Sequence, residues 1–242
     1  MKNKYISLVL LSIFALQNNI FSMEKDVAGS REKTSQLIEL LNKPNINKRD
    51  LIVMFYLIVN KHNRADVNAK GDKGNTVLMY AVRLGDKDMV KSLISQGADV
   101  NVTDNDSYTV LMKAVTSGNT DIVKLLMQAG ADINAKTNNG YTALRIAVFF
   151  RHLDVIKLLI HAGIDVNAKF RNFGDTPIVL AVKNVGLRSD WDLDIDLIKL
   201  LISQGADVDA VDDEGLFALG WAQLANLPQD ILDLLEDPNI RK

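Results

Sequence analysis

The 242-residue chain has no cysteine and only three histidines. The absence of cysteine excludes disulfide bonds and a lipid anchor attached to cysteine, and it fits an oxidising or a reducing compartment equally. Of the histidines His62, His152 and His161, the last has no acidic or nucleophilic residue at a matching spacing. The sequence also contains no glycine-rich phosphate loop, serine nucleophile motif or metal-ligand cluster. We therefore expect no enzyme, and no catalytic residue, cofactor or metal.

A clustered basic face is missing as well. The chain has 28 basic and 30 acidic residues, a net charge of -2, and its lysines and arginines are spread among aspartates. A protein that binds nucleic acid needs basic residues gathered on one face to neutralise phosphates. The composition therefore disfavours a nucleic-acid partner.

The N-terminus is apolar over a stretch too short to cross a membrane. Lys2 and Lys4 precede the mostly apolar run from Ile6 to Leu16, polar residues follow, and Ser22 is a small residue at a suitable cleavage point. A membrane span needs ~20 apolar residues, whereas this order is typical of a secretory signal peptide. We expect residues 1–22 to direct export to the periplasm or the medium, with an uncleaved anchor as the alternative. Cleavage would remove two lysines and no acid, so the net charge would fall from -2 to -4.

An internal repeat follows. The segments "NTVLMYAVRLGDKDMVKSLISQGADVN", "YTVLMKAVTSGNTDIVKLLMQAGADIN" and "YTALRIAVFFRHLDVIKLLIHAGIDVN" align, and their threonines Thr76, Thr109 and Thr142 lie 33 residues apart. A fourth copy has Thr176 and resumes at "DLIKLLISQGADVDA" after about eight extra residues, and a fifth, degraded copy follows. Each copy has apolar residues at helical spacing over two short segments. Neither amphipathic helix can bury its apolar face alone, so stacking of the copies is expected.

Signals for helix ends recur with the same period. Asn119 and Asp86 are suitable N-caps for the second helix of their copies, and a glycine follows that helix where a left-handed residue would end it. These glycines are Gly97, Gly130, Gly163 and Gly205. The "GAD" aspartates are interpreted as turn residues that bind their own backbone rather than as catalytic carboxylates.

The pattern resembles the ankyrin repeat, a 33-residue unit with a T-P-L-H-x-A first helix and a second helix that ends in L-L-x-x-G-A-D-x-N. The resemblance covers roughly residues 64–236. Only the fourth copy has the proline, Pro177, and none has the histidine, where Met79, Met112, Arg145 and Val179 stand. The resemblance implies a mainly α solenoid of stacked helix-turn-helix units with β-turn or hairpin loops.

On this interpretation the chain divides into successive units. Residues 23–29 form a flexible leader and 30–69 a divergent N-terminal capping repeat, with helices over 30–41 and 48–61. Repeats then span 70–102, 103–135, 136–168 and 169–210, the last with an insertion near 186–194, and residues 211–242 form a C-terminal capping repeat. Terminal repeats differ because one face must meet water.

The family resemblance also implies that a partner binds in the concave groove and at the turn tips. The positions concerned precede each threonine or follow it by seven and eight residues, and in the fourth copy they include Asp175, Lys183 and Asn184. Aromatic residues concentrate toward the middle, as in binding hot spots; alternatively, the phenylalanines pack between repeats and the tyrosines cover the turns. The candidate partner-binding residues are Arg83, Asp106, Tyr108, Asn139, Tyr141, Phe149, Phe173 and Trp191.

The insertion places Trp191 among three aspartates, Asp190, Asp192 and Asp194. It is interpreted either as a partner-binding finger or as a loop that folds back over neighbouring helices. A calcium loop would need a glycine and a terminal glutamate that this segment lacks, so no metal is expected.

We therefore expect a monomeric, exported module that binds a protein partner whose identity the sequence does not give. Bacteria that live with eukaryotic hosts often encode such arrays, and the lysine-, asparagine- and isoleucine-rich sequence fits such a genome. The alternative is a structural, self-assembling or tethering protein of the cell envelope.

Overall fold

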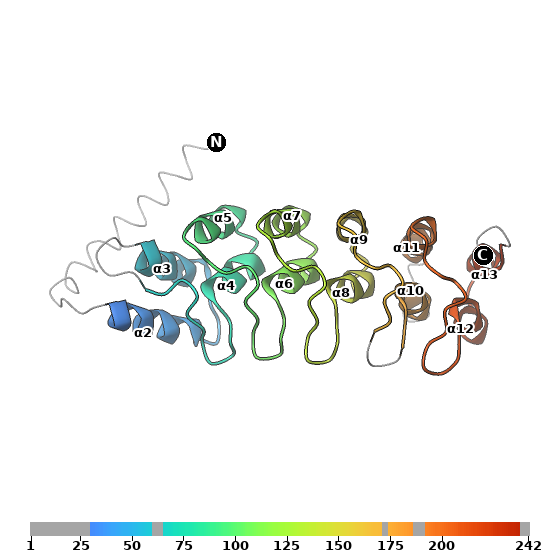
Figure 1. Ribbon diagram of the computed structural model, residues 1–242, viewed down its shortest axis with the longest axis horizontal. Helices are drawn as coiled ribbons and strands as arrows, with labels where there is room; N and C mark the ends of the chain where they lie inside the picture. Colours follow the sequence, from blue (N-terminus) through green and yellow to red (C-terminus); the bar gives the residue numbers. More distant parts are fainter. Residues whose placement is uncertain (1–29, 60–64, 171–173, 186–191, 238–242) are drawn as a thin grey trace.

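The computed structural model describes residues 30–59, 65–170, 174–185 and 192–237. Over these residues the chain forms twelve helices and no strand, apart from one isolated bridge between Thr103 and Thr109. Five further pairs of helices follow an N-terminal pair, and the pairs stack side by side into an elongated two-layer array, with hairpin loops projecting from one side (Figure 1). No helix in this part of the chain is both long and apolar enough to cross a membrane.

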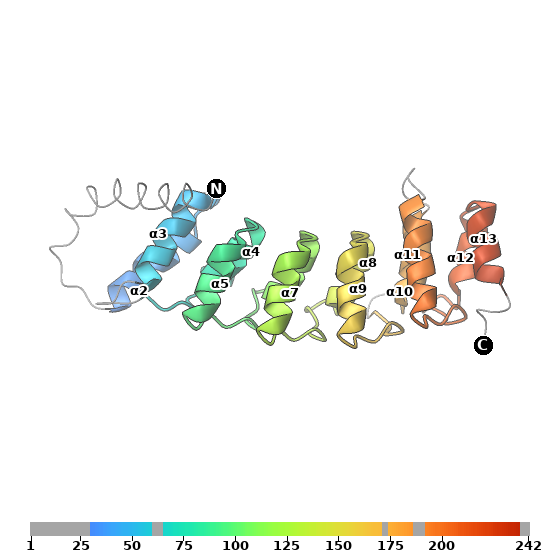
Figure 2. The same cartoon turned by 90° about the horizontal axis from the view of Figure 1, so that it is seen from above.

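Each pair has one helix in either layer. The N-terminal pair is α2 (Ser30–Leu41) and α3 (Lys48–Val59). The first helices of the later pairs form the layer next to the hairpins: α4 (Val77–Arg83), α6 (Val110–Thr116), α8 (Ala143–Phe149), α10 (Pro177–Val185) and α12 (Ala218–Leu224). The second helices form the outer row that faces the viewer in Figure 2: α5 (Lys87–Ser95), α7 (Thr120–Gln128), α9 (Leu153–His161), α11 (Asp192–Ser203) and α13 (Gln229–Glu236).

The repeated threonines begin the first helices. The hydroxyl oxygens of Thr76, Thr109, Thr142 and Thr176 each accept a hydrogen bond from the backbone N–H three residues later, at 3.1 to 3.5 Å. All four threonines are buried, so the cap satisfies a helix N–H that water cannot reach. The period read from the sequence is thus a period of helix starts.

The second helices begin and end as expected from the sequence. Asp86 and Asn119 accept hydrogen bonds from Met89 and Ile122 backbone N–H groups at 3.0 and 3.1 Å. His152 holds the same position without capping; its Nε2 lies 3.2 Å from the Thr116 carbonyl oxygen of the preceding pair. After the helices, the glycines identified from the sequence have φ between 84° and 89°, where a side chain would be strained.

One continuous core lies between the two layers. The alanines at the fifth position after each N-cap threonine, Ala81, Ala114, Ala147 and Ala181, have no exposed surface, and their small size lets neighbouring first helices approach closely. Leu93, Leu126, Leu159 and Leu201 occupy the matching buried place in the outer row. Each pair therefore buries its apolar faces against the next.

The "GAD" turns connect neighbouring pairs through asparagine. The Asp99 carboxylate accepts a hydrogen bond from the Asn101 backbone N–H at 2.8 Å. The Asn101 side chain in turn donates to the Gly130 carbonyl at 3.1 Å and accepts from the Asp132 N–H at 2.8 Å. This arrangement supports the interpretation of these carboxylates as turn residues.

The helices flanking the insertion are longer than their counterparts. α10 has nine residues and α11 twelve, against seven and nine in the preceding pair. Residues 192–194, which the sequence analysis placed in the insertion, are the first turn of α11. The inserted length is therefore partly helical, and residues 186–191 lie outside the described residues.

Candidate functional site

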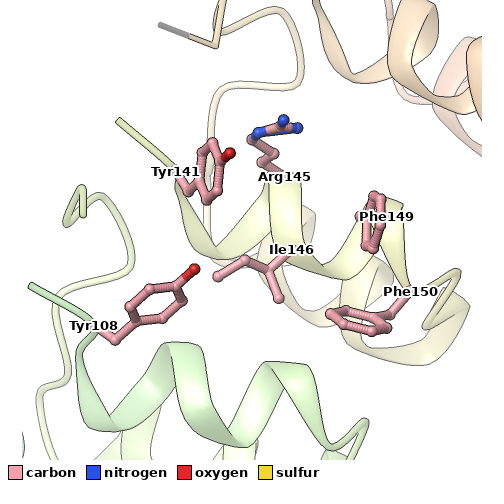
Figure 3. A pocket seen from close by; sticks show the side chains of 6 residues that line it. All are labelled: Tyr108, Tyr141, Arg145, Ile146, Phe149 and Phe150. Carbon is pink, nitrogen blue, oxygen red and sulfur yellow. The ribbon is translucent and has the colours of Figure 1, made fainter. Parts of the chain in front are cut away.

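Two adjoining hollows lie beside the hairpins and the first helices. The first, which we call the aromatic hollow, has a volume of about 240 Å³ and is lined by Tyr108, Tyr141, Arg145, Ile146, Phe149 and Phe150 (Figure 3). The second, the polar hollow, has a volume of about 460 Å³. Its lining residues are Asn75, Met79, Tyr80, Arg83, Asp104, Asp106, Tyr108, Lys113, Thr116 and Ser117. Because Tyr108 lines both, the two form one groove over α4, α6 and α8.

The hairpins fix the two tyrosines. Tyr108 and Tyr141 immediately precede the N-cap threonines of α6 and α8. The Tyr108 N–H donates to the Asp104 carboxylate at 2.9 Å, and the Tyr141 N–H donates to the Thr137 hydroxyl at 3.0 Å. Burial raises the pKa of the Tyr108 phenol, and the nearby Tyr141 and Asp104 raise it further. This phenol therefore remains a hydrogen-bond donor at neutral pH.

Arg145 lies between two aromatic rings. Its guanidinium carbon is 4.3 Å from the centre of the Tyr141 ring and 5.4 Å from that of Phe170, which are cation–π distances. Phe170 is buried, whereas Arg145 is partly exposed. Two rings thus hold the guanidinium at the edge of the aromatic hollow.

Two phenylalanines close the other side of this hollow (Figure 3). Phe149 ends α8 and Phe150 caps it, and their rings meet edge to face with centres 5.2 Å apart. Phe150 also stacks on His152 at 5.9 Å. Phe149 is 44% exposed and Phe150 41% exposed. Adjacent aromatic side chains this exposed are unusual on a monomer surface and are typical of an interaction site.

The polar hollow carries paired charges. Lys113 and Asp104 form a salt bridge of 2.6 Å, and the Arg83 guanidinium lies 4.8 Å from the centre of the Tyr80 ring. The Tyr80 hydroxyl donates to the Leu41 carbonyl at 3.0 Å, which ties α4 to the N-terminal pair. Asp106 is exposed beside them. This half of the groove offers hydrogen bonds and both signs of charge.

The fourth copy does not extend the groove in the way expected from the sequence. Asp175 and Asn184 are only 4% and 6% exposed, so the expectation that they line the open groove is wrong. Lys183 bridges Asp175 at 2.7 Å and Asp212 at 2.9 Å, and its Nζ lies 4.1 Å from the centre of the Trp221 ring. The following pair supplies Asp212 and Trp221, which cover these positions.

The candidate residues from the sequence fall into three groups. Arg83, Asp106 and Tyr108 line the polar hollow, and Tyr108, Tyr141 and Phe149 line the aromatic hollow. Asn139 is exposed at its hairpin tip but lines neither hollow. Phe173 and Trp191 lie outside the described residues.

Sequence reasoning missed Arg145. The residues at its place in three other copies, Met79, Met112 and Val179, are at most 1% exposed. An arginine at a position that is otherwise buried and apolar was the signal that could have identified it. In the sequence pattern it stands out only as a departure from the family's histidine.

No group of three or more histidine, aspartate or glutamate side chains suited to a metal ion occurs among the described residues. What the groove does present is aromatic surface, hydrogen-bond donors and charged groups of both signs, which include the guanidinium groups of Arg83 and Arg145.

These features define an elongated solenoid of helix pairs with a lateral groove, a class of protein that exposes an extended recognition surface. The sequence model of three ankyrin repeats matches residues 44–137 and 97–170, and that of the single ankyrin repeat matches residues 173–213. The chain therefore belongs to the ankyrin-repeat family. Proteins of this family generally mediate protein–protein interactions and are typically not enzymes. No curated protein matches the chain.

Proposed function

We propose that this chain is a protein-interaction module that binds a partner protein through the groove over α4, α6 and α8 and through the adjoining hairpin tips. The observation that carries the proposal is the exposure of Phe149 and Phe150 beside Tyr108 and Tyr141 in one hollow. Burial of these rings by a partner would remove apolar surface from water, at ~25 cal/mol for each Å². Aromatic residues gathered in this way are the usual energetic centre of an interface.

The polar hollow supports the same proposal from the other half of the groove. Its salt bridge between Lys113 and Asp104 and its exposed Asp106 can discriminate among partners, because complementary charge sets register and excludes wrong partners. Affinity would come from the aromatic hollow and specificity from the polar one.

The double variant Tyr141→Ala with Phe149→Ala tests the proposal. We expect circular dichroism and thermal melting to show a folded chain, because both side chains lie at the surface of the array. We expect capture of the native partner from cell envelope and culture supernatant to fall at least tenfold, the usual consequence of truncating two hot-spot residues.

Leu224→Ala is the matched control. Leu224 is 65% exposed and stands seven residues after the N-cap of α12, as Phe149 does after that of α8, yet it lines neither hollow. Unchanged capture by the double variant, or an equal loss with Leu224→Ala, would exclude the groove as the binding site. If light scattering showed a molecular mass that grows with concentration in the absence of a partner, the result would instead favour self-assembly over the monomer expected from the sequence.

We also propose that the chain is exported, to the periplasm or the medium. Support comes from the sequence alone, in the order of Lys2 and Lys4, the apolar run and Ser22. Fractionation of the native cells with mass determination of the mature N-terminus tests this proposal. A chain that starts at Met1 and is recovered from the cytoplasm would contradict it.

A further inference from the structure

Arg145 is the one charged residue that lines the aromatic hollow. It is partly exposed at a place where other copies bury a methionine or a valine. Its position is restricted by the rings of Tyr141 and Phe170. A guanidinium within cation–π distance of two rings can still donate hydrogen bonds from its N–H groups.

Within the described residues, Arg145 forms no salt bridge, unlike the lysines of the neighbouring copies. Lys113 has Asp104 at 2.6 Å, and Lys183 has Asp175 and Asp212 at 2.7 and 2.9 Å. Asp104 and Asp212 stand at the base of their hairpins, where the backbone N–H of each donates to the carbonyl oxygen of Tyr108 or Leu216. Phe170 makes the same backbone contact, to Asp175. The hairpin position that holds an aspartate in two copies, Asp104 and Asp212, therefore holds Phe170 beside Arg145.

A ligand that fills the aromatic hollow must cover this guanidinium. Removal of its water without a compensating anion or acceptor is costly, whereas a carboxylate forms two parallel, charge-assisted hydrogen bonds with it. The remaining lining, Ile146 with Phe149 and Phe150, accepts a large apolar side chain. The hollow of about 240 Å³ is also smaller than the ~300–1,000 Å³ typical of small-molecule sites, which fits one or two side chains of a peptide.

We propose that the aromatic hollow binds a peptide segment of the partner protein in which a glutamate or aspartate lies next to a large apolar residue. The carboxylate binds Arg145, and the apolar side chain packs on Phe149 and Phe150. This inference rests on the proposed function and specifies the chemistry of the partner. Single-stranded nucleic acid, which also stacks on aromatic residues, is disfavoured because a phosphate backbone needs several cations, whereas Arg145 is the one cation of the aromatic hollow and Lys113 of the polar hollow is already paired with Asp104.

The experiment starts from a nine-residue peptide library displayed on phage and selected on the full chain. The best peptide is then synthesised with a fluorescent label, together with a counterpart in which its acidic residue is replaced by the matching amide. Fluorescence anisotropy gives the Kd of both peptides for wild type, Arg145→Gln and Arg49→Gln. Arg49 is an exposed arginine of α3 outside both hollows, so its variant controls for the change in net charge.

We expect the selected peptides to be enriched in an acidic residue beside a large apolar one. The amide peptide should bind wild type and Arg49→Gln about tenfold more weakly than the acidic peptide, as for loss of a charged hydrogen bond. Arg145→Gln should bind both peptides with nearly equal Kd, so the double-mutant cycle isolates the pair. Arg145→Lys, which keeps the charge but loses the two-pronged geometry, should recover part of the tenfold preference, and circular dichroism confirms that each variant is folded.

Four results would overturn the inference. Selected peptides without acidic enrichment that still lose binding in the Tyr141→Ala, Phe149→Ala variant would refute the carboxylate and leave the proposed function standing. An acid preference that persists in Arg145→Gln would place the carboxylate elsewhere. Recovery of no peptide, or tighter binding of a labelled single-stranded oligonucleotide, would refute a peptide ligand, and the capture experiment would then decide the proposed function separately.

Discussion

The α8/α9 and α10/α11 pairs place different chemistry at the same two positions. One residue before the N-cap threonine and seven residues after it stand Tyr141 and Phe149 in the former, and Asp175 and Lys183 in the latter. The first two are left open to solvent in a hollow, with Phe149 44% exposed. The second two form a 2.7 Å salt bridge, with Asp175 only 4% exposed. The same backbone positions can therefore form a binding surface or a covered structural contact.

The next pair along the array decides which outcome occurs. Beyond α10, the α12/α13 pair contributes Asp212 and Trp221, and the Trp221 indole N–H donates to the Asp212 carboxylate at 2.7 Å. These two groups cover Lys183. Beyond α8, the equivalent hairpin residue is Phe170, which stacks on Arg145 and brings no carboxylate. Exposure of a groove position is thus a property of two neighbouring repeats and not of one.

Loss of the shared core should have the largest effect, because both regions depend on it. Leu126 has no exposed surface and lies in α7, which packs against α6, one of the helices below the groove. Leu126→Asp buries a charge without a partner, so we expect a loss of unfolding free energy on the order of 4 kcal/mol. Urea unfolding followed by circular dichroism measures it. A variant that unfolds at the same urea concentration as the parent would show that the core around Leu126 does not stabilise the array.

The next largest loss of stability is expected in a paired test of Lys183 and Phe149, which occupy the same position in their copies. Lys183→Met keeps the carbon stem but leaves Asp175 and Asp212 without their cation; the Asp212 side chain has no exposed surface. We expect a loss of about 3 kcal/mol, since removing one partner strands a buried charge. Phe149→Ala should cost about 1 kcal/mol or less, because nearly half of this side chain already meets water. Equal losses in urea unfolding would abolish the distinction between a structural and a recognition position.

Much of this architecture could be predicted from the sequence because its signals are local. The 33-residue spacing of Thr76, Thr109 and Thr142 indicated the repeat, and Asp86 and Asn119 were predicted as N-caps of the second helices, where the structure places them. The glycines after the second helices have the left-handed conformation expected from their position. The caps and glycines depend on a few neighbouring residues, and their recurrence in several copies makes them stand out.

The candidate site could be predicted only in part, because burial there depends on side chains from the adjacent pair. Tyr108, Tyr141 and Phe149 do meet in one hollow, as the periodic groove positions suggested. The same rule failed at Asp175, because it took no account of the side chains beside Lys183 and treated every copy alike. It also passed over Arg145, whose exposure follows from a bulky charged side chain at a place that other copies fill with apolar ones.

The pH dependence of the unfolding free energy sharpens the comparison further. Burial alone would raise the pKa of Asp212, but hydrogen bonds from Lys183, the Leu216 backbone and Trp221 outweigh it and lower the pKa from 3.8 to about 2. Because the folded-state pKa is the lower one, the carboxylate stabilises the fold fully above pH 4, and this contribution is lost as the pH falls toward 2. The lowering of the Asp212 pKa from 3.8 to about 2 corresponds to a contribution of about 2 kcal/mol to the free energy of unfolding.

Urea unfolding between pH 6 and about pH 2.5 should therefore show a steeper loss of stability for wild type than for Asp212→Asn, because the asparagine has no carboxylate that takes up a proton as the pH falls. Trp221→Phe keeps a ring near Lys183 but removes the indole donor, so its pH dependence should be intermediate. If wild type and Asp212→Asn lost stability in parallel, the hydrogen bonds to Asp212 would make no net contribution to the free energy of unfolding. The covered arrangement around Lys183 would then depend on apolar packing alone.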